Sequence, residues 1–306
     1  MRILVCGGNG YIGSALCSYL NDKGYHGTSV DVEWFGTAIP LSRWNTIRRM
    51  DYGALKADSI SKYDVVIVTA AHSSVSMCQK DPYGAIRNNV GNFSSLLSKM
   101  RKGQKLIYAG SSCVYTGRLE MSYETALLLP PKDYLTLTKQ TIDHIACLSD
   151  VEFYGLRFGS VNGWSPNLRS DLMINAMTMS GLTKGVVQVS NVDQYRPILA
   201  MDDLCRAVEA ITNCGEDRRG IYNLANFNVR IGVVGEAVAE ITGVPLENMG
   251  GPRGYDFRMD CSHFCRTFDF EFKSKLTDIV HGLVVGLQNK TGLVGGRDVN
   301  MEYKGV

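Results

Sequence analysis

Apolar runs alternate with amphipathic stretches through the first half of the chain. Short apolar runs, which suit buried strands, lie at residues 2–6, 28–32, 64–70, 105–109 and 153–158. Between them, residues 13–23, 82–100 and 136–148 carry apolar side chains at the spacing of one helix face. Alternation of strands and helices is typical of a parallel sheet with crossover helices. We therefore predict an α/β fold built on an open, doubly wound parallel sheet.

The regular alternation ends near residue 160. Gly, Asn, Pro and Met cluster between residues 159 and 185, and a strand-like run at 186–190 and a helical pattern at 201–212 follow. We expect residues 1–160 to form the sheet domain, with 186–225 returning to it. Residues 161–185 and 226–306 should form a smaller C-terminal substrate-binding region over the carboxyl ends of the strands, where open sheets bind ligands.

A glycine-rich stretch, CGGNGYIGSAL, follows the first predicted strand and opens the first predicted helix. A tight turn and a close approach of backbone to a pyrophosphate at the helix N-terminus require this pattern; the residues are Gly7, Gly10, Tyr11, Ile12 and Gly13. A merely structural turn is the alternative for the glycines alone. Asp31 ends the second predicted strand, where a carboxylate accepts from both ribose hydroxyls and repels a 2′-phosphate. Together these features predict a Rossmann-type domain that binds NAD in preference to NADP, with a solvated turn carboxylate as the alternative for Asp31.

Charge and cysteine usage narrow the possible partners and the cellular location of the protein. The 306 residues include 32 basic and 30 acidic ones, for a formal net charge of +2. This balance does not suit a nucleic acid or an anionic membrane as a partner. Nine cysteines are scattered without a CxxC pair, which predicts reduced thiols and no metal site. The amino-terminal apolar run is too short for a signal peptide, and no run approaches the roughly 18 apolar residues of a membrane span, so we expect a cytoplasmic protein.

Further motifs resemble those of the extended short-chain dehydrogenase/reductase family, specifically its NAD-dependent sugar-nucleotide epimerases and dehydratases. Besides the glycine loop, they are VVIVTAAHSSVSMCQKDPYGAIRNNVGN, LIYAGSSCVYTG, LRFGSVNG, YRPILAMDDLCRA, GIYNLAN and RGYD. They run in the order of the family, whereas the C-terminal tail matches poorly. The resemblance implies that NAD is the cofactor and that its site also includes Asp51, Tyr52, Ala70, Ala71 and Asn89.

The resemblance also implies a nucleotide-diphosphate sugar as the ligand beside NAD. Its contacts would come from Ser112, Ser160, Asn175, Arg196 and Arg253. Arg196 and Arg253 stand where the family places the arginines that bind the diphosphate, and a guanidinium suits those oxygens, although either could be a solvated surface residue. Asn175 could equally lie on a helix surface, and Ser160 replaces an Asn that is common in the family.

Proton transfer in this family uses a Tyr as the base, a Lys that lowers the Tyr pKa, and a Ser or Thr that hydrogen-bonds the same oxygen. The resemblance assigns these roles to Tyr134, Lys139 and Ser111, with a turn-capping role as the alternative for Ser111. A phenol with an ordinary pKa near 10 needs a nearby cation to act as a base at neutral pH.

The spacing of this pair is unusual. Residues five apart differ by about 140° around a helix, whereas residues four apart differ by about 40° and share a face. A match on Lys139 puts Leu135 at the Tyr position, and a match on Tyr134 puts Thr138 at the Lys position. Three explanations stay open: an irregular turn or π-bulge realigns the pair, an enzyme works with one partner replaced, or the protein binds NAD and a ligand without turnover.

The resemblance favours an NAD-dependent epimerase, or a related oxidoreductase, that acts on a nucleotide-diphosphate sugar by transient hydride transfer to bound NAD. The 4,6-dehydratases of this family carry an Asp-Glu pair just before the Val-Tyr. This chain has Ser112 and Cys113 there, which argues against dehydration. The alternative is a non-catalytic regulatory protein that binds NAD and a nucleotide sugar on the same fold. We expect a homodimer paired through two helices, one of them at about 136–148.

Overall fold

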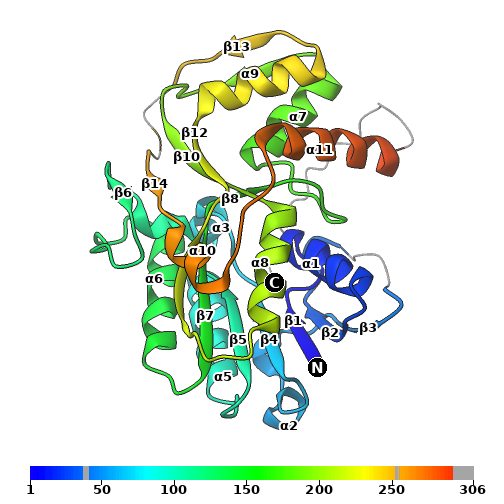
Figure 1. Ribbon diagram of the computed structural model, residues 1–306, viewed down its shortest axis with the longest axis vertical. Coiled ribbons are helices and arrows are strands. Elements are labelled where there is room, and N and C mark those ends of the chain that lie inside the picture. The colour runs from blue at the N-terminus through cyan, green and yellow to red at the C-terminus, as the bar shows by residue number, and fades with distance from the viewer. Residues whose placement is uncertain (37–40, 252–253, 255, 292–306) are drawn as a thin grey trace.

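A seven-stranded parallel sheet forms the centre of the molecule (Figure 1). The computed structural model describes residues 1–36, 41–251, 254 and 256–291. The strand order is β11-β7-β5-β4-β1-β2-β3. The strands are Arg2–Cys6 (β1), His26–Asp31 (β2), Trp44–Arg48 (β3), Val65–Val68 (β4), Lys105–Ala109 (β5), Glu152–Phe158 (β7) and Gly220–Leu224 (β11). The order reverses between β1 and β4, so the predicted doubly wound, Rossmann-type sheet is confirmed.

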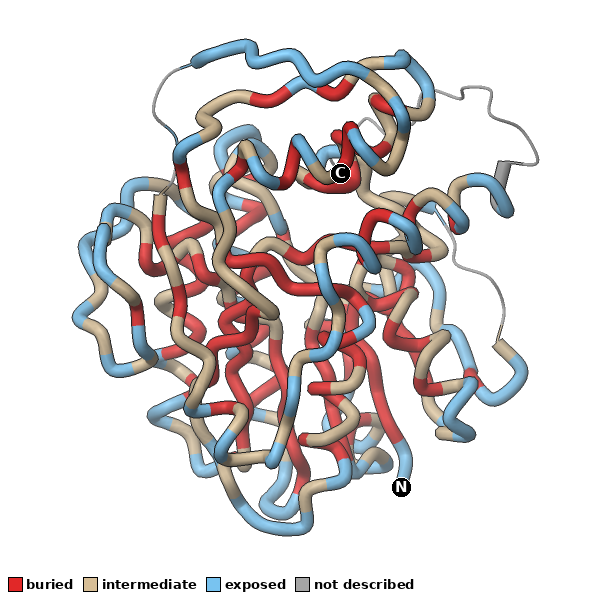
Figure 2. Tube along the Cα trace, turned by 45° about the horizontal axis from the view of Figure 1, so that its top comes forward, coloured by how far each residue is buried: buried red, intermediate tan, exposed pale blue. Residues whose placement is uncertain are grey.

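Helices cover both faces of this sheet because alternate strand residues point to opposite sides. Ile3 and Val5 face a cluster that includes Leu16 and Leu204, whereas Leu4 faces a cluster that includes Phe93. The first face carries α1 (Tyr11–Asp22), α8 (Met201–Asn213) and α10 (Ser262–Phe268). The second carries α5 (Phe93–Leu97) and α6 (Tyr134–Cys147), and α4 (Pro82–Ile86) and the π-helical turn η2 (Arg87–Asn92) adjoin them. Figure 2 shows the resulting buried layers along the strands.

Short elements complete this half of the molecule. They are α2 (Ala57–Ile60), α3 (Val75–Lys80), and the single turns η1 (Tyr52–Ala54) and η3 (Ser112–Tyr115). Two features differ from the sequence prediction. The helix expected at 82–100 is interrupted by η2, and β3 was not predicted because four of its five residues are partly or fully exposed at the sheet edge.

A second, smaller part of the chain lies at one end of the sheet (Figure 1). Its sheet is β12-β10-β8, and two strand pairs, β13 with β9 and β14 with β6, stand apart. These strands are β6 (Met121–Ser122), β8 (Ser160–Asn162), β9 (Val187–Val189), β10 (Tyr195–Ala200), β12 (Phe227–Arg230), β13 (Leu246–Asn248) and β14 (Arg258–Met259). The helices α7 (Met173–Lys184), α9 (Ile231–Thr242) and α11 (Leu276–Thr291) pack together through Ile174, Val234 and Val280.

A buried ion pair joins α6 to the sheet. Arg157 Nε of β7 donates to Asp143 Oδ2 of α6 at 2.9 Å, and Tyr108 OH donates to Asp143 Oδ1 at 2.9 Å. Arg157 Nη1 also donates to the hydroxyl of Tyr115 at 2.7 Å. Every charge in this network has a partner, which is the condition under which a protein interior tolerates charges. The network fixes the rotation of α6 about its own axis.

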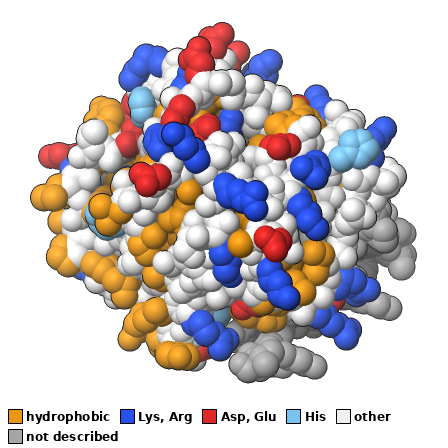
Figure 3. Space-filling model, turned by 90° about the horizontal axis from the view of Figure 1, so that it is seen from below, with side chains coloured by type: hydrophobic (Ala, Val, Ile, Leu, Met, Phe, Trp, Pro, Cys, Tyr) orange, Lys and Arg blue, Asp and Glu red, His pale blue; other side chains and the backbone are white. Residues whose placement is uncertain are grey.

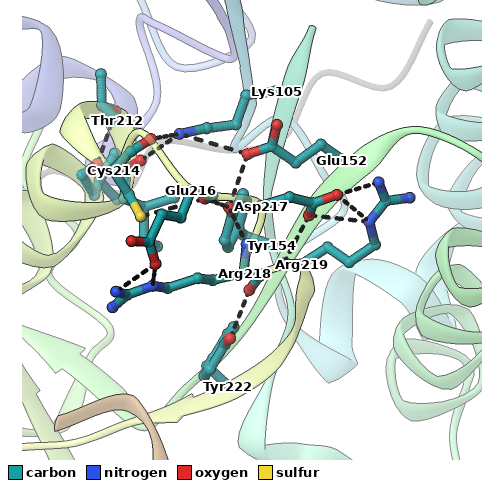
Figure 4. Close-up of polar contacts among 12 residues, drawn as sticks. Lys105, Glu152, Tyr154, Thr212, Cys214, Glu216, Asp217, Arg218, Arg219 and Tyr222 are labelled. Atoms are coloured by element: carbon teal, nitrogen blue, oxygen red, sulfur yellow. Dashed lines mark hydrogen bonds and ion pairs between the residues drawn. The ribbon is translucent and has the colours of Figure 1, made fainter. Parts of the chain in front are cut away.

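A second polar cluster lies at the amino ends of β5 and β7 (Figure 4). Lys105 Nζ donates to the carbonyl oxygens of Ile211 at 2.8 Å and Cys214 at 2.7 Å. A cation here satisfies carbonyls at the C-terminal end of α8, where the helix dipole is negative. Asp217 and Arg219 form an ion pair in the same cluster, and both side chains are exposed.

Replacing Asp143 by Ala should lower the free energy of unfolding by about 3–5 kcal/mol, because Arg157 would remain buried without its partner. The matched control is Asp217→Ala, which removes an exposed ion pair and should cost at most about 1 kcal/mol. Urea unfolding followed by circular dichroism measures both. Equal losses in the two variants would contradict a structural role for the buried pair.

Candidate functional site

A cleft of about 790 Å³ opens at the carboxyl ends of β1, β2 and β4. Its wall includes most of the residues predicted for the cofactor: Gly7, Gly10, Tyr11, Ile12, Gly13, Asp31, Asp51, Tyr52, Ala70 and Ala71. They come from four separate segments of the chain, which the parallel sheet brings to one edge. The cleft therefore lies at the point where the strand order reverses.

The glycine loop is shaped by contacts that leave no room for side chains. Gly7 has a φ of +92°, and a Cβ there would lie 2.5 Å from the backbone nitrogen of Ala70. A Cβ on Gly13 would overlap the carbonyl of Gly7. Gly10 has no side chain to cap α1, so the amino end of this helix faces the cleft with its backbone N–H groups. Such an arrangement favours an anionic group.

Asp31 ends β2 at the rim of the cleft. Its Oδ2 accepts the backbone N–H of Asn9 at 2.9 Å, and its Oδ1 accepts that of Glu33 at 2.7 Å. Burial raises the pKa of Asp31 above its ordinary value, and backbone hydrogen bonds from Glu33, Asn9 and Gly10 oppose this rise. A carboxylate offers about four lone-pair positions, and the three backbone N–H groups leave one for a ribose hydroxyl.

Asp51 and Tyr52 follow Met50, whose backbone N–H donates to the carbonyl of Asp31, and η2 holds both residues in the cleft wall. Asp51 Oδ1 accepts from Asn92 Nδ2 at 2.7 Å and from the backbone of Gly53 at 3.0 Å. Tyr52 donates its hydroxyl hydrogen to the carbonyl of Asn88 at 2.8 Å. The π-helical turn thus supports this wall of the cleft, as such turns often do at functional sites.

Asn89 lies behind the cleft wall and is buried. Its Oδ1 accepts the backbone N–H of His72 at 2.8 Å, and its Nδ2 donates to the carbonyl of His72 and to Thr138 Oγ1, both at 3.1 Å. All of these contacts are made with protein atoms. The structure therefore gives Asn89 a role in positioning the segment after β4 against α6.

The cleft also contains residues that the sequence analysis missed. His72 is buried in its wall, with its ring against Trp34 at 5.0 Å between centroids and its Nε2 3.6 Å from Asp81. Burial lowers the pKa of His72 from its ordinary value, while Asp81 opposes this change. Its place directly after Ala71 was a signal that could have found it.

Residues 163–172 close the far side of the cleft. Asn167 Nδ2 donates to the carbonyl of Asn9 at 2.5 Å, and Ser165 Oγ donates to that of Tyr11 at 2.6 Å. Arg169 pairs with Asp171 and also lines the cleft. Ser165 and Asn167 are marked by no local pattern, because their partners on the glycine loop lie more than 150 positions away in the sequence.

The predicted catalytic residues lie on and beside α6. This helix is regular from Tyr134 onward, with Asp133 accepting the backbone N–H of Thr136 at 2.8 Å, so no π-helical turn realigns the pair. Lys139 is 6% exposed and Leu135, one turn earlier, is 8% exposed, whereas Tyr134 is 41% exposed. Lys139 and Leu135 therefore share the buried face of α6, and Tyr134 lies on another.

Lys139 reaches back to the sheet. Its Nζ donates to the carbonyl of Ala109 at 2.6 Å, two residues before Ser111. Ser111 caps the η3 turn by accepting the backbone N–H of Cys113 at 3.2 Å. Leu135 packs in an apolar cluster with Cys78 and Ala85. The structure thus brings Lys139 and Ser111 to the end of β5 and places no phenol on the face of α6 that carries Lys139.

The predicted substrate residues that the structure describes lie on four separate elements, η3, β8, α7 and β10. Asn175 is fully buried rather than on a helix surface: its Nδ2 donates to the hydroxyl of Tyr11 at 3.1 Å, and its Oδ1 accepts from Gly163 at 3.0 Å. Ser112 is buried in η3, Ser160 begins β8, and Arg196 on β10 donates to the carbonyl of Tyr195 at 3.0 Å. Arg253 lies outside the described residues.

The described part of the chain holds neither a metal-binding cluster nor a membrane-spanning helix. No group of three or more His, Cys, Asp or Glu side chains there could hold a metal ion. No helix there is long and apolar enough to cross a membrane.

Residues 3–225 match the model of the NAD dependent epimerase/dehydratase family. The match covers most of the chain, which therefore belongs to this family. Among curated proteins, the chain is similar to Protein CapI of Staphylococcus aureus, with 27% identity over 240 residues that span 69% of each protein.

Solved structures of similar fold include two sugar-nucleotide epimerases. One is UDP-glucuronic acid 4-epimerase from Bacillus cereus, in complex with UDP-glucuronic acid and NAD; its TM-score is 0.83 at 21% identity, covering 95% of this chain and 100% of that one. The other is UDP-glucose 4-epimerase from Thermotoga maritima with UDP-glucose; its TM-score is 0.83 at 19% identity, covering 95% and 99%. At these identities the likeness shows the fold.

The burial of Lys139 predicts a pH dependence of stability. Burial lowers the pKa of Lys139 from its ordinary value of 10.5, so the unfolded chain takes up this proton at a higher pH than the folded chain. The stability of the wild type relative to Lys139→Met should therefore rise as the pH is raised toward 10.5. Urea unfolding at several pH values measures this difference. The control is Lys132→Met, at an exposed lysine, whose unfolding free energy should differ from that of the wild type by the same amount at every pH. A difference between wild type and Lys139→Met that does not change with pH would contradict the prediction.

Proposed function

We propose that the protein binds NAD in the cleft and acts on a nucleotide-diphosphate sugar as an NAD-dependent epimerase or a related oxidoreductase. The observation that carries this proposal is the cleft itself. It joins the side-chain-free amino end of α1, which suits a pyrophosphate, to Asp31, which suits the ribose hydroxyls. Membership of the epimerase/dehydratase family supports the same conclusion.

The proposed reaction distributes roles among residues of this chain. Bound NAD would accept a hydride from a sugar carbon and return it. Lys139, whose Nζ donates to the carbonyl of Ala109, and Ser111, two residues further along the chain, would hold the nicotinamide ribose and the reacting sugar oxygen. Arg196 and Arg253 would bind the diphosphate, with Ser112, Ser160 and Asn175 shaping the sugar site. Residues 1–160 and 186–225 would then serve the cofactor, and 161–185 and 226–306 the substrate.

A second candidate is a regulatory protein that binds NAD and a nucleotide sugar without turnover. The observation that favours it is the buried face of α6, where Leu135 precedes Lys139 by one turn. Leucine cannot accept a proton, so the hydroxyl of the sugar would have no base at this position.

The test of the proposed function begins with purified protein. Nucleotides released on denaturation are identified by mass, and the native protein is then incubated with a panel of sugar nucleotides while NADH absorbance and epimeric products are followed. We expect NAD and at least one epimerised or oxidised sugar. Release of NAD without turnover of any sugar would favour the regulatory protein. The absence of both bound NAD and turnover would refute both proposals.

Substitutions on α6 separate the roles of Tyr134 and Leu135. We expect Tyr134→Phe to leave turnover within about twofold and Leu135→Tyr to raise it by about 10²-fold, because only the second variant places a phenol one turn before Lys139. Leu135→Phe is the matched control, since it adds the ring without the hydroxyl. Steady-state rates on the same sugar nucleotide measure the effect. Loss of turnover in Tyr134→Phe would instead identify Tyr134 as the base.

We also propose a homodimer that pairs through α4 and α6. These helices pack beside each other and expose the apolar side chains of Tyr83, Ile86 and Leu137. Figure 3 shows apolar side chains gathered toward the left, the side on which α6 lies in Figure 1, and charges of both signs elsewhere on this face. Sedimentation equilibrium should give twice the mass of the chain; the mass of one chain would contradict the dimer.

The cysteines support a cytoplasmic location as part of this proposal. All nine are free thiols, and several, such as Cys6 and Cys17, are buried. Free thiols persist in a reducing compartment.

A further inference from the structure

Glu33, whose backbone N–H donates to Asp31 at the rim of the cleft, forms an ion-paired cluster with two arginines. Arg48 donates to it from Nε at 2.6 Å and from Nη2 at 3.3 Å, and Arg49 Nε lies 3.7 Å from its second oxygen. The Glu33 side chain is only 6% exposed, whereas those of Arg48 and Arg49 are 57% and 83% exposed. The carboxylate is therefore the fixed member of the cluster, and the two guanidinium groups are held to it from the solvent side.

The backbone at this place is strained. Glu33 and Arg49 have φ values of 61° and 53°, in the left-handed region that residues other than glycine seldom adopt. The two residues that carry this strain are the ones whose side chains face each other. Strain of this kind persists only where surrounding contacts hold it, and it is common at functional sites.

The cluster is connected directly to Asp31. Arg48 is the pairing partner of Asp31 in the register of β2 and β3, and the backbone N–H of Met50 donates to the Asp31 carbonyl at 3.1 Å. Asn9 of the glycine loop contacts both carboxylates: its backbone N–H donates to Asp31 at 2.9 Å and its Nδ2 to Glu33 at 3.2 Å. The cluster therefore adjoins Asp31 both through the pairing of β2 with β3 and through Asn9 of the glycine loop.

We propose that Glu33 determines the choice between NAD and NADP by holding Arg48 and Arg49 away from the position of a 2′-phosphate. Two exposed arginines beside a ribose site are what a 2′-phosphate requires, because guanidinium groups bind phosphate oxygens in pairs. Here both are engaged by a buried carboxylate, and the Glu33 charge adds to that of Asp31 in repelling a phosphate. This inference rests on the proposed NAD site and names its specificity.

The test measures the dissociation constants of NAD and NADP for protein freed of bound nucleotide, and compares their ratio, NADP over NAD. Glu33→Gln should lower this ratio about tenfold, because it removes one negative charge and releases two cations. Arg48→Ala should raise the ratio by roughly threefold, because Glu33 then keeps its charge with less compensation. In the double variant Glu33→Gln with Arg48→Ala, most of the gain for NADP should disappear.

Controls separate the possible failures. Glu240→Gln, on the exposed face of α9, should leave the ratio unchanged, and circular dichroism shows whether each variant is folded. A folded Glu33→Gln with an unchanged ratio would overturn the inference while leaving NAD binding intact. If Glu33→Gln does not fold, Arg48→Ala decides: an unchanged or lowered ratio overturns the inference. A wild type that binds neither nucleotide would refute the proposed function itself.

Discussion

The close approach of the glycine loop to its neighbours is the constraint on which the cleft depends. A Cβ on Gly7 would reach the backbone of Ala70, and one on Gly13 would overlap the carbonyl of Gly7. Because both are absent, β1 can turn directly into α1 while remaining against β4, and the amino end of α1 is left facing the cleft. Asp31 and Ala70 reach the same cleft because β2 and β4 flank β1 in the sheet.

The rotation of α6 is a second constraint, and it decides whether Leu135 or Tyr134 lies on the helix face that carries Lys139. Leu135, Lys139 and Asp143 recur every four residues and share the buried face of the helix. Asp143 is bound to Arg157, and Lys139 to the carbonyl of Ala109. Turning the helix by the roughly 100° needed to replace Leu135 by Tyr134 would break both contacts and leave Arg157 buried without its partner. The buried ion pair therefore keeps Tyr134 off this face.

Local sequence patterns predicted the features that depend on neighbouring residues. The runs of β1 and β5 are fully apolar or nearly so, and the glycine spacing placed the turn into α1 correctly. Features that depend on distant residues were missed. Asn167 closes the cleft through a partner on the glycine loop. Glu33 pairs with Arg48 at the end of β3 and with Arg49 just after it, and β3 is an edge strand without an apolar run. The five-residue spacing on α6 was visible in the sequence, but only the contact of Asp143 with Arg157 shows which partner the helix keeps.

The energetics of α6 bear on whether the site is functional. Leu135 lies in an apolar cluster with Cys78 and Ala85, where burial is favourable and needs no compensation. Lys139 is buried at a cost that its lowered pKa records, and its one hydrogen bond to a neutral carbonyl repays only part of that cost. A helix face selected for stability alone would carry an apolar residue at this position, as it does at Leu135. Burial of Lys139 therefore costs free energy, whereas burial of Leu135 does not. Under the proposed function, a nicotinamide ribose bound near the end of β5 would accept further hydrogen bonds from the Lys139 ammonium group and so offset part of this cost.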